Sequence, residues 1–76
     1  MRTMQFKMER PGQVEAGQTV DITEGKLPSS FYYTIEPAVA MSGNYRLAAR
    51  LMARQGKVID VAETPSGFFV TCEFNE

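Results

Sequence analysis

The sequence contains no histidine and no tryptophan, and it has one cysteine among its 76 residues. Histidine is the commonest general base and a usual metal ligand, so its absence excludes Ser–His and Cys–His nucleophilic pairs and leaves no plausible zinc site. A single cysteine also cannot form a Cys-x-x-Cys redox motif. We therefore predict that the protein has no metal and no cofactor.

Other arrangements that support catalysis are missing too. The acidic residues are scattered over the sequence, and no glycine-rich loop followed by lysine is present to hold a phosphate. Asp60 and Glu73 are the carboxylates that could meet across a final hairpin, and a pair in such a place is more typical of a solvated face than of a glycosidase-type acid pair. We expect no catalytic residues, and we predict that the protein is not an enzyme.

Long apolar runs are absent as well. The first ten residues, MRTMQFKMER, include four charged residues and no apolar run. We therefore expect neither a signal peptide nor a membrane-spanning segment. A secreted domain of this size would usually depend on several disulfides, so the lone Cys72 indicates a reducing cytoplasm. The length predicts one small globular domain over residues 1–76 with a modest core.

What the sequence does contain is alternation. Three segments in its first half place apolar residues at every second position, which is the period of a half-buried strand. These are residues 3–9, 19–23 and 30–36, with the inward-facing side chains Met4, Phe6 and Met8, then Val20 and Ile22, then Phe31, Tyr33 and Ile35. Pro11-Gly12 ends the first of these segments and Pro37 ends the third, because proline lacks the backbone donor that a strand ladder needs.

The stretch NYRLAARLMARQGK, residues 44–57, departs from this pattern. Its apolar residues Leu47, Leu51 and Met52 recur at helical spacing, and Gly56 is placed to end a helix, which predicts a helix of about three turns. Two further strands are expected at 57–63 and 68–74, joined by a proline–glycine turn.

The last predicted strand places Phe68, Val70, Cys72 and Phe74 on one face. Because apolar neighbours surround Cys72 at the two-residue spacing, we expect this thiol to be buried and unreactive.

The predicted order is strand, strand, strand, helix, strand, strand. This favours a mainly β protein with one helix, folded as a small five-stranded β-barrel that is OB-like or SH3-like, because closure removes exposed strand edges. The segment GKVIDVAETPSGFFVTCEF, residues 56–74, is similar to the Gly-x-Val-x-x-Val hairpins of SH3-like barrels and KOW-type motifs. The alternative is an open antiparallel α+β sheet covered by the helix.

The best candidate for a binding site is a row of basic residues. On the predicted helix Arg46, Arg50 and Arg54 would form one ridge, which Lys57 extends. Guanidinium groups match phosphate and carboxylate geometry, so the ridge could hold an anion, but we favour the interpretation that it is the solvated side of a helix. The net charge of −1 disfavours a dedicated nucleic-acid binder.

A second candidate surface is aromatic. The alternation that buries Tyr33 and Phe68 directs their neighbours Tyr32 and Phe69 to the opposite face, where they could form a stacking surface or close the second side of the barrel. Two functions follow from these features. We favour a non-catalytic cytoplasmic interaction module that binds a protein partner or itself, and the alternative is binding of an anion or single-stranded nucleic acid through the arginine ridge.

Overall fold

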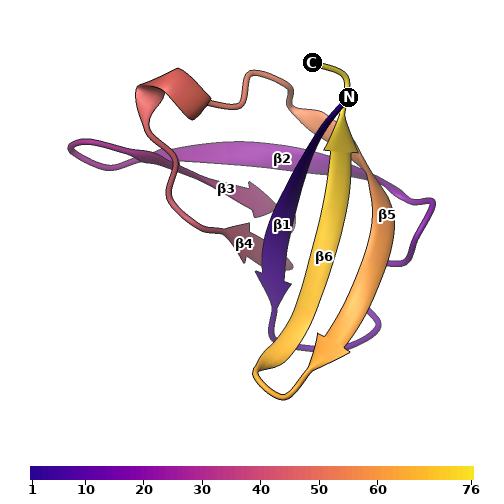
Figure 1. The fold of residues 1–76 in the computed structure, drawn as a ribbon. Helices are drawn as coiled ribbons and strands as arrows, with labels where there is room; N and C mark the ends of the chain where they lie inside the picture. Colours follow the sequence, from indigo (N-terminus) through magenta and orange to yellow (C-terminus); the bar gives the residue numbers. More distant parts are fainter.

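The alternating segments form the strands of a closed antiparallel barrel in the computed structural model, which describes residues 1–76 (Figure 1). Six strands surround the core, in the spatial order β1-β4-β3-β2-β5-β6. Their bounds are β1 Arg2–Met8, β2 Thr19–Lys26, β3 Phe31–Ile35, β4 Ala40–Ser42, β5 Gln55–Thr64 and β6 Gly67–Phe74. The prediction of a small, mainly β barrel is confirmed.

Most of the core consists of residues that the two-residue period placed inward, to which Val14, Ala40, Leu51 and Val58 are added. Fifteen hydrophobic side chains are buried there: Met4, Phe6, Met8, Val14, Val20, Ile22, Phe31, Tyr33, Ile35, Ala40, Leu51, Val58, Val70, Cys72 and Phe74. Cys72 is fully buried, as predicted, and burial raises the pKa of its thiol from 9.0 to about 11. No helix in the structure has the length and apolar character that a membrane span requires.

The predicted count of five strands is wrong, because β4 is a sixth. It has only three residues, which is too short for a sequence period to be recognised. Its pairing partners define it instead: Met41 lies opposite both Lys7 of β1 and Thr34 of β3. These ladders close the barrel, so the alternative of an open sheet is also wrong.

The predicted helix over residues 44–57 does not form. A single 3₁₀ turn, Leu47–Ala49, is its only helical part, and the segment continues into β5 at Gln55. The helical likeness to an OB-fold therefore has no basis in the structure. An isolated helix of this length is marginal in water unless a whole apolar face packs. Here Leu51 is fully buried, whereas Leu47 and Met52 are 71% and 64% exposed.

Gly56 does not end a helix either. It lies in β5, buried, where the ring of Phe74 packs so closely over its Cα that a β-carbon would overlap the ring. The residue is therefore a point of close approach between β5 and a core aromatic side chain, which is a common reason for glycine inside a strand.

Candidate functional site

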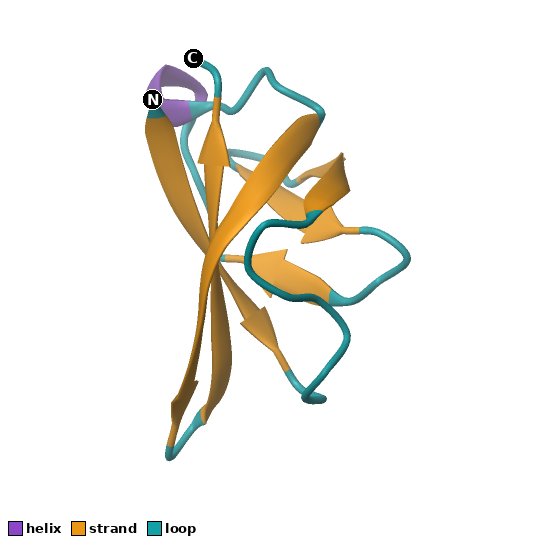
Figure 2. Ribbon diagram, turned by 90° about the vertical axis from the view of Figure 1, so that its right-hand side faces the viewer, coloured by secondary structure: helices purple, strands orange, loops and turns teal.

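Residues 43–54, which we call the strap, connect β4 to β5 across one end of the barrel (Figures 1 and 2). Leu51 inserts into the core from the strap. Its backbone N–H donates to the hydroxyl of Tyr33 at 2.8 Å, and that hydroxyl donates to Glu24 Oε2 at 2.9 Å. A buried tyrosine thus supplies the partner that this buried amide needs.

Glu24 of β2 is the centre of a charged network that holds the strap. Arg50 donates to it through two nitrogens, Nε to Oε2 at 2.9 Å and Nη2 to Oε1 at 2.8 Å. Paired bonds of this kind are the strongest geometry for an arginine and a carboxylate. The guanidinium carbon of Arg50 also lies 4.6 Å from the centre of the Phe31 ring, within the range of a cation–π contact.

These contacts shift the ionisation of Glu24. The hydrogen bonds from Arg50 lower its pKa from 4.5 to about 2, and the bond from Tyr33 and the nearby charge of Arg54 act in the same direction, opposed by partial burial. The side chain is only 13% exposed, compared with 34% for Arg50. Glu24 is therefore ionised and fully engaged in the folded protein.

Arg54 fixes the C-terminal end of the strap. Its Nη1 donates to the carbonyl oxygens of Leu51, Met52 and Ala53 at 3.0, 3.2 and 3.1 Å. Its Nη2 lies 3.6 Å from Glu24 Oε1. Backbone groups that a helix would have satisfied internally are here satisfied by a side chain, which explains how the segment stays extended.

The two ends of the chain complete the attachment of the strap. Arg2 donates to the carbonyl oxygens of Ala49 and Arg50, and the side chain of Glu76 accepts from the backbone N–H groups of Met52 and Ala53 at 3.1 and 2.7 Å. These backbone donors are the main cause of a lowered pKa at Glu76. Residues far apart in the sequence thus attach the strap to the barrel.

The four residues of the predicted basic ridge lie in different environments in the structure. Arg50 and Arg54 bind Glu24 and the strap backbone, whereas Arg46 is exposed and its side chain forms no ion pair or hydrogen bond. Lys57 lies on β5, exposed, in register with Glu73 of β6. The four basic groups therefore do not form one row, because the helix that would have aligned them is absent.

The two predicted aromatic residues are also separated. Tyr32 lies on β3, half-buried, with its ring folded over Gly25 of the neighbouring strand. Phe69 lies on β6, half-buried between Lys7 and Ala62. Because β3 and β6 are three strands apart in the barrel, Tyr32 and Phe69 do not share a surface.

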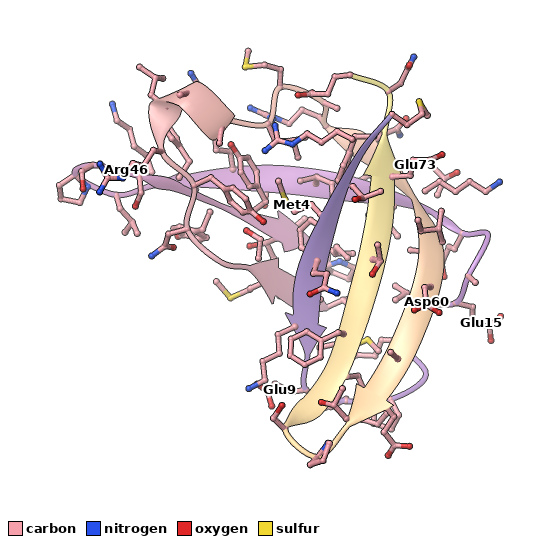
Figure 3. The ribbon with its side chains drawn as sticks, in the orientation of Figure 1. Met4, Glu9, Glu15, Arg46, Asp60 and Glu73 are labelled. Atoms are coloured by element: carbon pink, nitrogen blue, oxygen red, sulfur yellow. The ribbon has the colours of Figure 1, made fainter.

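A cleft of about 410 Å³ lies between the β2–β3 hairpin and the strap. Its walls carry two exposed leucines, Leu27 from the hairpin and Leu47 from the strap. The lining residues are Glu24, Lys26, Leu27, Pro28, Ser29, Ser30, Phe31, Leu47 and Arg50. Tyr45 pairs with Phe31 at this end of the barrel, and Figure 3 shows Arg46, the next residue, beside the hairpin.

Neither Glu24 nor the cleft is marked by any pattern in the sequence. Glu24 occupies an ordinary position after the predicted second strand, and nothing local indicates that Arg50, twenty-six residues later, would bind it. The exposed Leu27 next to Pro28 was the available signal for the cleft, since an apolar residue at a turn is not needed for the core.

No protein family model, no curated protein and no solved structure matches this chain. The strap and the cleft are therefore the features from which a function can be inferred.

Replacing Glu24 with glutamine should destabilise the protein in a pH-dependent way. The pKa of Glu24 falls from 4.5 to about 2 on folding, so its charge stabilises the folded state fully above about pH 4.5, and this contribution is lost as the pH falls towards 2. The free energies of unfolding of wild type and Glu24→Gln should differ by a constant amount near neutral pH and converge in acid. Urea titrations at a series of pH values measure this.

The control is Glu63→Gln, at an exposed carboxylate that has no ion-pair or hydrogen-bond partner. A difference between wild type and Glu24→Gln that stayed constant down to pH 2 would show that Arg50 does not control the ionisation of Glu24.

Proposed function

We propose that this protein is a non-catalytic binding module that holds an acidic segment of a protein partner in the cleft between the β2–β3 hairpin and the strap. The observation that carries the proposal is the pair of leucines on its walls. Leu27 is 37% and Leu47 is 71% exposed, although both face a concave surface. An apolar side chain of a partner placed between them would bury both, which is favourable by about 25 cal/mol per Å² of apolar area.

The charge around the cleft supports an acidic partner. Lys26 lines it and Arg46 lies beside it, and neither forms an ion pair within the protein. Of the three arginines in the strap, Arg50 and Arg54 are paired with Glu24, so Arg46 is the one whose charge is free to attract a partner. Basic groups at the rim of an interface steer an acidic partner and select its orientation, while the apolar centre supplies affinity.

The geometry disfavours the alternative function, binding of an anion or single-stranded nucleic acid. Arg50 already has its two best donors on Glu24, so it is not available to a phosphate. Tyr32 and Phe69 also lie on strands on different sides of the barrel. The non-catalytic role rests on the lack of histidine in the sequence, and the cytoplasmic setting rests on the single, buried cysteine.

An NMR titration tests the proposal. The probes are a pool of short peptides in which glutamates flank a central leucine, a matched pool with lysines, inorganic phosphate and a single-stranded oligonucleotide. The acidic pool should shift the amide resonances of residues 26–31 and 46–50. Substituting Leu47 with serine should weaken binding roughly tenfold, as expected for loss of a central apolar contact of 1.4 kcal/mol.

Met52→Ser is the matched control, because Met52 is exposed to a similar extent but lies outside the cleft. Arg46→Gln tests the basic rim of the cleft. Substitutions at Arg50 or Arg54 are unsuitable for this purpose, because they would also release the strap from Glu24. Shifts produced by phosphate or the oligonucleotide, with a steep loss of binding in salt, would support the alternative function instead. No shift in the cleft with the acidic pool would contradict the proposal.

A further inference from the structure

The strand β5 is longer than the barrel requires. Its first residues pair with β2, ending at Lys57 opposite Thr19. Val58 still exchanges hydrogen bonds with Gly17 and Gln18, which belong to the loop between β1 and β2. Gly17 then has a φ of 93°, which turns the loop away from β5. From residue 59 onward, β5 is paired on one side only, with β6.

The register of the hairpin shows which backbone groups this leaves free. Thr64 and Gly67 flank a two-residue turn, and antiparallel ladders alternate between hydrogen-bonded and non-hydrogen-bonded pairs. Thr64, Ala62 and Asp60 therefore direct their N–H and C=O groups at β6, and Val61 and Glu63 direct theirs outward. No hydrogen bond within the protein involves the outward groups of Val61 or Glu63.

This edge is accessible. Asp60, Ala62 and Glu63 are exposed and Val61 is half-buried. Figures 1 and 2 show the β5–β6 hairpin projecting beyond the rest of the barrel, and in Figure 2, which looks onto this edge, no loop crosses the lower part of β5. An uncovered strand edge with unpaired donors and acceptors is a template for an additional strand.

We propose that residues 59–63 accept an extended, basic segment of a partner as an added strand. Asp60 and Glu63 lie on this edge, and Figure 3 shows Glu15, from the loop between β1 and β2, on the same side as Asp60. Within residues 59–63 the charged residues are Asp60 and Glu63, and no basic residue is present. Backbone hydrogen bonds would supply the affinity of strand addition, and side chains opposite the two carboxylates would supply the specificity.

The spacing of the carboxylates defines the partner further. Asp60 and Glu63 are three residues apart, so they project from opposite faces of the strand. An added strand would match both if it has two basic residues three apart, Lys-x-x-Lys, with β-branched residues between them. The edge does not suit a second copy of the chain, because two such edges would bring four carboxylates along one short ladder with no base among them.

The test is amide hydrogen exchange of the intact protein with short synthetic peptides. The amides of Val61 and Glu63 should exchange fast in the free protein, and those of Ala62 and Thr64 slowly. A Lys-x-x-Lys peptide with valine and threonine between and beside the lysines should slow exchange at Val61 and Glu63, on the order of tenfold when the site is mostly occupied. A peptide with glutamate in place of lysine, and one with the lysines two apart, should have much less effect.

Two variants separate the backbone from the charge. Glu63→Pro removes one outward N–H without removing a bond to β6, and should abolish the protection of Val61. Glu63→Gln keeps that N–H, so it should only weaken the protection of Val61. Both should still bind the acidic peptides in the cleft, so failure of this inference is distinguishable from failure of the proposed function.

Three results would overturn the inference. They are unchanged exchange at Val61 with the Lys-x-x-Lys peptide, equal protection by its glutamate counterpart, and protection that rises with protein concentration alone, which would identify a second copy as the occupant. If Glu63→Pro does not fold, the comparison of the three peptides on the wild-type protein decides the question.

Discussion

Replacing Leu51 with alanine should lower the free energy of unfolding by about 2–5 kcal/mol, whereas the same change at Leu47 should alter it by about 0.5 kcal/mol or less. The side chain of Leu51 points from the strap into the end of the barrel and is fully buried, so alanine would leave a cavity among core side chains. Leu47 is 71% exposed and contributes nothing comparable to the core. Urea unfolding followed by circular dichroism measures both values.

This pair of variants discriminates between the strap and a helix. An amphipathic helix over residues 44–57 would bury Leu47 and Leu51 on one stripe, and the two substitutions would then destabilise the protein to a similar extent. Comparable losses of several kcal/mol at both positions would therefore contradict the extended strap. Leu47→Ala should also weaken binding of the acidic peptides, which separates its role in the cleft from stability.

The second large effect is expected at Gly56. Alanine there should destabilise the protein by about 1–3 kcal/mol, because its β-carbon would overlap the Phe74 ring. That ring is 1% exposed and packed against Phe6, with 6.3 Å between the ring centres, so it has little room to move. The change in free energy of unfolding can be measured in the same urea titrations.

Gly43→Ala is the matched control, since no atom lies within 4 Å of the position its β-carbon would take and its φ is not positive. That substitution should leave stability unchanged or raise it by up to about 1 kcal/mol, because alanine restricts the unfolded chain. Equal stability of Gly56→Ala and wild type would show that the Phe74 ring adapts and that the close approach does not constrain residue 56.

The two proposed surfaces differ in charge as well as in place. Lys26 lines the cleft and Arg46 lies beside it, and neither forms an ion pair, whereas the free edge of the β5–β6 hairpin carries the carboxylates Asp60 and Glu63 and no base. A net charge of −1 thus conceals two regions of opposite sign. A protein with this distribution can select an acidic and a basic segment at separate sites, because screening limits each field to about 10 Å at ordinary ionic strength.

The sequence by itself determined the inner and outer faces of the strands. Alternation depends only on the two-residue period of an extended backbone, which is why the burial of Phe6, Tyr33 and Cys72 is confirmed without knowledge of their neighbours. The final hairpin is confirmed for the same reason, since proline and glycine define its turn locally.

Tertiary structure decided everything that depends on a distant partner. The spacing of Leu47 and Leu51 matches a helix, but Arg2, Glu24 and Glu76 satisfy the backbone and the arginines of an extended strap, and no window of sequence contains those contacts. β4 exists only because two other strands flank it. Local periodicity predicts which face of a segment is apolar, whereas the conformation of the strap follows from hydrogen bonds and packing formed only once the barrel has closed.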